Sequence, residues 1–333
     1  MEHAVSLHER HLVLGKYRPL RPLGSGGSGS VWLARDERSA REVALKVVPR
    51  EGKAGLRAER EVEAATRLRH PRCLRALAFE RDERHVYVAY PYVTGHTLRE
   101  LLRGGGLADA TAVEAASQVL EALAHAHAKG VVHRDVKPAN IMLEEGDEVS
   151  VRLLDFGLAQ IDETETLTAV GDVPGTLGYI APERLAGREA TGAADVWAVG
   201  VLLWEALAGR HPFWAISPLE TARRVEVGAQ PLASVRPDLP RSLCRAVDRM
   251  LQPAPGQRPG AREAAAVLRA AWATRVERRR AATSRTTLRE RALHAALAAV
   301  FVAGSTILLP FFPAGWPYLL GALAGRHPFW AIS

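Results

Sequence analysis

The chain has 333 residues, 47% of them hydrophobic and 24% charged, so it can bury a sizeable core and hold one large domain with an appendage. Its net charge of +7 would suit a nucleic-acid-binding protein, but no aromatic residues are interleaved with the basic run at 275–291, so we expect no nucleic-acid partner. The two cysteines, Cys73 and Cys244, lie far apart without metal-ligand spacing, which predicts inert buried thiols and a reducing compartment.

The first predicted elements are a polar tail and a glycine-rich hairpin. Residues 1–16 are polar and lack the apolar stretch of a signal peptide. From Tyr17 the pattern is strand, glycine loop, strand, and it fits G-x-G-x-x-G-x-V with Gly24, Gly26, Gly29 and Val31. Backbone without Cβ atoms can approach phosphates closely and offer them N–H donors. A dinucleotide-binding turn uses similar glycines, but the residues after Gly29 show no helical period, which favours a hairpin.

A single lysine interrupts the next apolar strand, at 43–48. Lys46 must find an anion there, because burying an unpaired cation is costly. The following segment, 56–68, predicts a helix, and its candidate partners for the lysine are Glu59, Glu61 and Glu63. Two more strands are predicted at 74–79 and 85–90.

The stretch 131–142 contains the residues best suited to chemistry. Within eight residues it places a carboxylate (Asp135), a cation (Lys137) and an amide oxygen (Asn140). Phosphoryl transfer needs these three groups, to orient a hydroxyl, to stabilise the moving phosphoryl group and to ligate a metal ion. Helices are predicted before it at 97–103 and 109–129, and His125 and His127 in the second are predicted to be structural rather than metal ligands.

A second motif that contains an aspartate follows the stretch 131–142. The apolar strand that begins at Val151 ends in Asp155-Phe156-Gly157, twenty residues after Asp135. This order places Asp155 beside Asn140, where both can ligate Mg²⁺. An ordinary strand-to-turn Asp-x-Gly is the alternative, and this spacing disfavours it.

Residues 17–272 resemble the bacterial eukaryotic-like Ser/Thr protein kinases (Hanks type), because these motifs occur in the family's order and Ala181-Pro182-Glu183 follows them. The resemblance implies an α+β, bilobal fold. Its N-lobe (17–93) would hold an antiparallel sheet and one helix, and its C-lobe (94–272) would be mainly helical. Lys137, two residues after the catalytic Asp135, is typical of the Ser/Thr class.

The resemblance also implies roles for individual residues. Asp135 would orient the hydroxyl, and Lys137 and Lys46 would stabilise phosphate charge. Counting back from His70-Pro71 selects Glu61 to hold Lys46, and Thr176 would contact Asp135 and Lys137. Asn140 and Asp155 would bind the metal ion. The nucleotide would be contacted by Leu23, Gly24, Gly26, Gly29, Val31, Ala44, Lys46, Tyr90, Pro91, Val93 and Met142.

One residue of this set departs from the family pattern. Many members carry glutamate after the gatekeeper, here Tyr90, where this chain has Pro91. Proline keeps the carbonyl that contacts adenine and lacks only the N–H, and Val93 would supply an N–H. The departure therefore leaves nucleotide binding intact. The resemblance implies structural roles for His133, Arg134, Phe156, Gly157, Glu183, Asp195 and Arg258, with Asp195 binding the catalytic-loop backbone and Arg258 pairing with Glu183.

The threonine-rich segment 158–177 is predicted to be a loop that phosphorylation controls. Arg134 directly precedes Asp135 and needs an anion to balance its charge. Thr166 and Thr168 form a Thr-x-Thr pair like those that related kinases autophosphorylate. An unmodified loop is the alternative.

The tail predicts membrane attachment. A basic juxtamembrane segment (273–291) precedes an uncharged apolar stretch (292–312) that is long enough to span a bilayer as a C-terminal hydrophobic helix. The arginines on its near side predict a kinase domain in the cytoplasm, at the cell membrane. A buried amphipathic helix is the alternative. In the last segment (313–333), residues 322–333 repeat 206–217 letter for letter, and our hypothesis is a truncated or misjoined coding sequence, with a tail that mimics the loop as the alternative.

The sequence therefore predicts an ATP-dependent Ser/Thr protein kinase that uses Mg²⁺, with Mn²⁺ as an alternative metal. We expect protein substrates, attachment to the inner membrane and a homodimer for trans-autophosphorylation. A pseudokinase scaffold and a small-molecule phosphotransferase are the competing hypotheses. Pseudokinases usually lack the lysine, the base or a metal ligand, and this chain has all of them.

Overall fold

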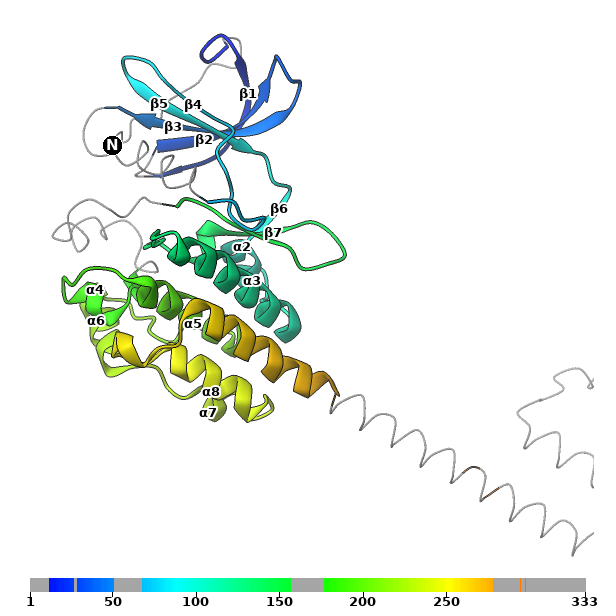
Figure 1. Cartoon of the computed structure of the whole chain (residues 1–333), viewed down its shortest axis with the longest axis vertical. Helices are drawn as coiled ribbons and strands as arrows, with labels where there is room; N and C mark the ends of the chain where they lie inside the picture. The colour runs from blue at the N-terminus through cyan, green and yellow to red at the C-terminus, as the bar shows by residue number, and fades with distance from the viewer. Residues whose placement is uncertain are drawn as a thin grey trace, which may run out of the picture. The chain divides into compact units, whose positions relative to one another are not determined.

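Five antiparallel strands form the sheet of the N-lobe in the computed structural model, which describes residues 12–26, 29–50, 68–156 and 177–277 together with residues 294 and 297. The spatial order is β1-β2-β3-β5-β4 (Figure 1). The strands are β1 (Tyr17–Gly26), β2 (Gly29–Asp36), β3 (Glu42–Pro49), β4 (Ala78–Arg81) and β5 (His85–Pro91).

Alternation along β3 and β5 gives the sheet two apolar faces, because successive side chains of a strand point to opposite sides. Leu45 and Val47 pack with Tyr17 and Tyr87 in one cluster. Val48 packs in another cluster with residues of β5 that include Tyr90. Both faces are therefore buried. Residues 56–67 of the single helix predicted at 56–68 lie outside the described residues, and Leu68 is described as buried and non-helical.

The fourth strand begins later than predicted. Residues 74–77 are not in the sheet, because Leu74 donates its N–H to the carbonyl of Leu153 in the C-lobe and only Leu77 reaches the carbonyl of Ala89 in β5. Strand β4 starts at Ala78, where regular pairing with Ala89 begins. The side chains of Leu74 and Ala76 pack against the cluster that contains Val48 and β5, whereas Leu77 is exposed. The segment thus contacts the sheet through side chains without continuing its strand pairing.

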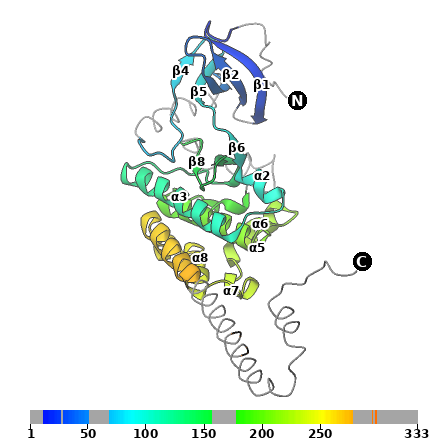
Figure 2. The same cartoon turned by 90° about the vertical axis from the view of Figure 1, so that its right-hand side faces the viewer.

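The C-lobe combines a small sheet with helices (Figures 1 and 2). Its three antiparallel strands are ordered β6-β7-β8, with bounds β6 (Gly95–Thr97), β7 (Ile141–Glu144) and β8 (Val151–Leu153). The α-helices are α2 (Leu98–Arg103), α3 (Asp109–Ala128), α4 (Pro182–Leu185), α5 (Gly192–Ala208), α6 (Pro218–Val227), α7 (Leu232–Val235) and α8 (Arg241–Met250), and residues 261–277 are also helical. Short 3₁₀ turns are η1 (Pro138–Asn140), η4 (Leu177–Tyr179) and η5 (Pro255–Gln257).

Helix α5 is the centre of this lobe. Its residues include Trp197 and Trp204, which are 0% and 1% exposed, so its central turns are surrounded by protein as its nearly apolar sequence predicts. It ends at Gly209, whose φ of +70° is the left-handed conformation that glycine adopts at helix ends. Because residues 194–204 of α5 are buried, side chains in this part of the helix are held by surrounding core packing.

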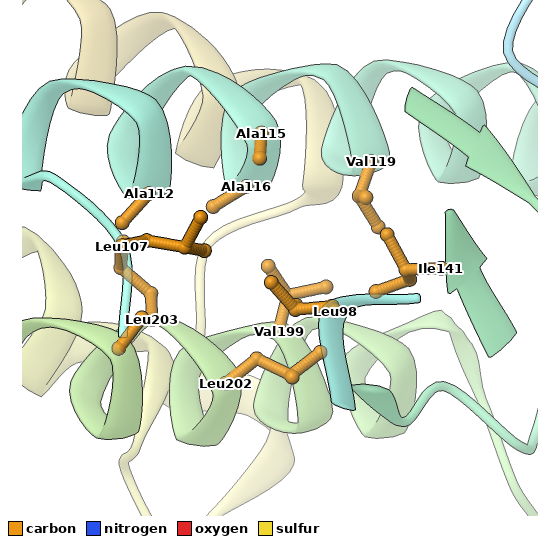
Figure 3. Close-up of a pocket in the computed structure, with 11 residues that line it drawn as sticks. Leu98, Leu107, Ala112, Ala115, Ala116, Val119, Ile141, Val199, Leu202 and Leu203 are labelled. Carbon is orange, nitrogen blue, oxygen red and sulfur yellow. The ribbon is translucent and has the colours of Figure 1, made fainter. Parts of the chain in front are cut away.

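A small apolar cavity remains between α2, α3 and α5 (Figure 3). Leu98, Ala116, Ile141, Val199 and Leu203 are among its lining residues, and all carry apolar side chains. Three alanines of α3 leave this space because they are too short to fill it; they are Ala112, Ala115 and Ala116.

The chain divides into two compact units, Met1–Ala273 and Thr274–Ser333. In the part that the structure describes, no helix is both long and apolar enough to cross a membrane. The stretch predicted to do so, 292–312, lies outside that part apart from the helical residues 294 and 297. The repeat at 322–333 also lies outside it. In the described copy, Phe213 is buried, whereas Trp214 and Ile216 are exposed.

Candidate active site

The residues predicted to do chemistry meet in the loop that leads into β7. The Nζ atom of Lys137 lies 2.8 Å from Oδ2 of Asp135. Asn140 is buried in the turn η1, and its amide nitrogen donates to the carbonyl of Asp135 at 2.8 Å and to Oδ2 at 3.0 Å. The base, the cation and the amide are therefore held against one another by direct contacts.

A buried carboxylate on α5 fixes the backbone of this loop, and a half-buried histidine on α3 contacts that carboxylate. Asp195, 1% exposed, accepts the N–H of His133 at 2.9 Å and that of Arg134 at 2.8 Å. His127, near the end of α3, lies 2.8 Å from the same carboxylate. These contacts satisfy the carboxylate that α5 buries, as such a group requires.

His133 links the loop to the next motif. Its Nδ1 accepts the N–H of Asp135 at 3.3 Å, so the other ring nitrogen carries the proton and donates to the carbonyl of Leu154 at 2.9 Å. Its ring also packs against Phe156, with 4.6 Å between centroids. Phe156 is 2% exposed, so it anchors the start of the segment that follows Asp155.

Lys46 and Asp155 join the two lobes. Their Nζ and Oδ1 atoms lie 3.1 Å apart, and the lysine side chain is only 6% exposed. The lysine on β3 has thus found an anion, as its burial requires. The partner predicted for it, Glu61, lies outside the described residues.

The donor set suits a hard divalent cation. Strands β7 and β8 pair with Ile141 opposite Leu153, and Leu154 donates its N–H to the carbonyl of Asn140 at 2.8 Å. This register brings Asn140 and Asp155 to the same end of the small sheet. Amide and carboxylate oxygens are the ligands that Mg²⁺ uses, usually one or two from the protein with the rest from phosphate and water. The residues present therefore fit such an ion.

The glycine hairpin and the strand behind it form the predicted nucleotide site. Gly29 has a φ of +115°, and a Cβ there would collide with the carbonyl of Val47, so only glycine fits. A Cβ on Gly24 would meet no other atom within 4 Å, which leaves open space beside the hairpin. The other predicted residues of these strands are Leu23 and Gly26 on β1, Val31 on β2 and Ala44 on β3, and Val31 pairs with Gly24.

The predicted nucleotide contacts continue from β5 into residues 91–93, which the kinase resemblance identifies as the hinge between the lobes. Tyr90 is 6% exposed and pairs with Ala44 across the sheet, and Pro91 pairs with Val43. Pro91 therefore ends the strand without disrupting the ladder. Val93 follows it, and Met142 lies on β7 opposite Thr97.

A buried ion pair fixes the segment after Leu177. Arg258 donates to both carboxylate oxygens of Glu183, at 2.7 and 2.8 Å, and these side chains are 0% and 4% exposed. The hydroxyl of Tyr179 donates to Glu205 at the end of α5, and burial raises the pKa of both groups. The turn η4 is thereby attached to α5.

The model of the protein kinase domain family matches residues 17–272 of this chain. The chain belongs to the protein kinase family. Family membership implies ATP and a divalent metal ion, which the oxygen donors and the hairpin described above fit.

Curated relatives support the same family. The chain is 35% identical over 272 residues to the serine/threonine-protein kinase PkaA of Streptomyces coelicolor, which covers 76% of this chain and 49% of that protein. It is 33% identical over 237 residues to PrkC of Bacillus subtilis, with coverages of 69% and 36%. For PknD of Mycobacterium tuberculosis the identity is 38% over 230 residues, with coverages of 67% and 34%. The chain thus spans about a third to a half of the length of these relatives.

Several predicted residues of the kinase site lie outside the described residues. They are Glu61, Gly157, Thr166, Thr168 and Thr176. Their roles remain predictions from the resemblance.

The structure also shows contacts that the sequence did not predict. Arg184 Nη1 donates to the carbonyl of Arg134 at 2.7 Å, and Arg21 of β1 donates to the hydroxyl of Tyr92 in the hinge at 3.2 Å. A guanidinium that binds a distant backbone carbonyl or a distant hydroxyl has no sequence signature. Helix α2, in contrast, begins with a capping box between Thr97 and Glu100, which the pattern Thr-x-x-Glu could have revealed.

Proposed function

We propose that this chain is an ATP-dependent protein kinase that transfers the γ-phosphoryl group to serine and threonine hydroxyls of proteins. The observation that carries the proposal is the contact set at the loop before β7. Asp135, Lys137 and Asn140 touch one another, and the pair formed by Asp155 and Lys46 adjoins them through the register of β7 and β8.

The roles follow from the chemistry of each group. Asp135 accepts the hydrogen bond of the attacking hydroxyl and orients it. Lys137, 2.8 Å from that carboxylate, supplies positive charge where the phosphoryl group is transferred, and Lys46 supplies it on the nucleotide side. The proposed mechanism includes no covalent bond between the protein and the phosphoryl group, so catalysis depends on positioning and electrostatic stabilisation. A metal ion held by Asn140 and Asp155 would neutralise charge on the phosphates.

Specificity for serine and threonine rests on two supports. Lys137 stands two residues after Asp135, as in the Ser/Thr class. The relatives compared above are named as serine/threonine-protein kinases. We further propose Mg²⁺ as the working metal, with Mn²⁺ able to replace it.

The decisive experiment measures transfer of label from γ-labelled ATP to a generic Ser/Thr protein substrate. Wild type should label it, Asp135→Asn should not, and the exposed Asp147→Asn provides the matched control with wild-type labelling. Phosphoamino-acid analysis should find phosphoserine and phosphothreonine. Equal labelling by wild type and Asp135→Asn would refute the proposal, and no labelling by wild type would favour a pseudokinase scaffold. Labelling of small molecules alone would favour a small-molecule phosphotransferase.

Phosphorylation of Thr166 and Thr168 is proposed as the activating step. Arg134 lies within the catalytic loop, so an anion that reaches it would order the site. The double variant Thr166→Ala/Thr168→Ala should lower turnover, and mass spectrometry of wild type should find phosphate at one or both positions. Unchanged turnover would remove the switch.

We also propose that the enzyme is attached to the membrane and that two copies associate for trans-autophosphorylation. The basic segment 273–291 followed by the apolar stretch 292–312 supports attachment to the inner face of the cell membrane. Removal of residues 292–333 should move the protein from the membrane fraction to the supernatant. Label appearing on a tagged Asp135→Asn chain that is mixed with wild type would show trans-phosphorylation, and its absence would exclude it.

A further inference from the structure

The backbone just before the catalytic base is in an uncommon conformation. Arg134 has a φ of +69°, in the left-handed region that a residue with a Cβ seldom adopts. Such a conformation persists only where surrounding groups hold it. At Arg134 the N–H is held by Asp195 Oδ1 at 2.8 Å.

The backbone carbonyl of Arg134 is held by a different helix from the one that holds its N–H. Arg184 Nη1 donates to it at 2.7 Å, the short distance expected of a charged donor. Arg184 belongs to α4, fifty residues further along the sequence. The backbone N–H and the backbone carbonyl of Arg134 are therefore both fixed by buried or partly buried side chains, one from α5 and one from α4.

Helix α4 is a rigid base for this contact. Its Glu183, immediately before Arg184, is locked in the buried pair with Arg258. The N–H of Arg184 donates to the carbonyl of Ala181 at 2.9 Å, which fixes the start of its side chain. The guanidinium is thus directed at the catalytic loop by a segment that cannot easily shift.

We propose that Arg184 is a positioning residue for the phosphoryl-transfer reaction. The carbonyl of Arg134 belongs to the peptide group that carries the N–H of Asp135, so the orientation of this peptide plane decides where the Asp135 carboxylate points. Arg184 fixes that plane, and Asn140 fixes the next one by donating to the carbonyl of Asp135. The inference rests on the proposed kinase function, because it concerns the geometry of that reaction.

The test compares three substitutions in the full chain. Arg184→Met removes the donor and keeps the aliphatic volume, Arg184→Lys keeps a cation that can donate to the carbonyl, and Arg188→Met is the matched control at an exposed arginine. The readouts are kcat, the KM values for ATP and for a protein substrate, and the thermal unfolding midpoint.

Arg184→Met should lower kcat by roughly 10- to 100-fold, as expected when a catalytic group is misplaced by a fraction of an ångström to one ångström. Both KM values should stay near those of wild type, since Arg184 contacts neither substrate in the proposed role. Arg184→Lys should recover a substantial part of kcat, and Arg188→Met should match wild type. A purely structural role would lower the unfolding midpoint without this separation of kcat from KM.

Three results would overturn the proposal. They are wild-type kcat in Arg184→Met, a rise in KM at constant kcat, and an equal loss of kcat in Arg188→Met. If Arg184→Met does not fold, Arg184→Leu, which also lacks a donor, takes its place: a kcat below that of Arg188→Met at unchanged KM values supports the proposal, and an equal kcat overturns it. Asp135→Asn in the same assay separates the two ideas: the kinase function fails if wild type is no more active than this variant, and then the positioning role fails with it.

Discussion

Replacing Arg258 with methionine tests the buried ion pair that fixes the segment after Leu177 by holding Glu183. The substitution removes both hydrogen bonds to Glu183 and those to the carbonyls of Ala193, Gln252 and Pro253. The guanidinium also stands 4.9 Å from the ring centre of Trp197. All these groups lose a donor or a packing partner at once.

The expected loss of stability is large, because Glu183 is left as a buried charge without its partner. Breaking a buried pair from one side costs about 3–5 kcal/mol. For a domain of this size each kcal/mol lowers the unfolding midpoint by about 2–4 °C, so we expect a fall of roughly 6–20 °C. Removing the second charge as well, in Glu183→Met/Arg258→Met, should restore part of the loss, since no unpaired carboxylate then remains.

Urea and thermal unfolding of the purified chain measure these differences. The control is Arg249→Met, which breaks an exposed pair with Glu263 whose side chains are 55% and 53% exposed, and which should change stability by less than about 1 kcal/mol. A loss below about 1 kcal/mol for Arg258→Met, or a double variant less stable than the single one, would contradict the reasoning.

Three further predictions concern other parts of the fold. Gly29→Ala should lower the unfolding midpoint, because the new Cβ would collide with the carbonyl of Val47. Gly24→Ala should leave the midpoint unchanged, because its Cβ would enter open space. Equal midpoints for the two variants would show that the close approach of Gly29 to Val47 does not constrain the hairpin. Burial lowers the pKa of His211 to about 4, so the unfolded chain binds the proton first as the pH falls below about 6.5, and stability is lost between those values. His211→Asn should therefore lose roughly 2 kcal/mol less than wild type between pH 7 and pH 4.5 in urea unfolding, and parallel losses would show that this histidine is not responsible. Leu203→Ala should cost about 2–5 kcal/mol by enlarging the apolar cavity, and benzene should then raise the midpoint of this variant but not that of wild type; no benzene effect would show that the site collapses.

The motifs predicted the two-lobed kinase fold, which is confirmed in the described residues, whereas the roles of the site residues stay predictions. Asp135, Lys137 and Asn140 lie within one short loop of the sequence, so their closeness in space follows from local geometry. Contacts over long sequence distances were predicted only where the family resemblance supplied them, as for Arg258 with Glu183.

Other contacts could not be read from the sequence because they depend on the tertiary fold. The pattern of residues 74–77 predicts a strand, yet the N–H of Leu74 donates to the carbonyl of Leu153 in the C-lobe. His127 lies on α3 without an acidic neighbour in sequence, and only the packing of α3 beside α5 brings it to Asp195. Arg184 contacts a backbone carbonyl, which every residue has, so the type of residue at position 134 does not indicate this contact.

The hydrogen bonds that Asp195 accepts have a consequence for how the active site fluctuates. The amide protons of His133 and Arg134 are bonded to a buried carboxylate on α5, so the loop must break these bonds before either proton can exchange. These two amides should therefore exchange with deuterium more slowly than amides in the exposed turns of the lobe. Because their acceptor is carried by a core helix, a substitution that weakens the packing of α5 should also speed this exchange and shorten the lifetime of the ordered catalytic loop.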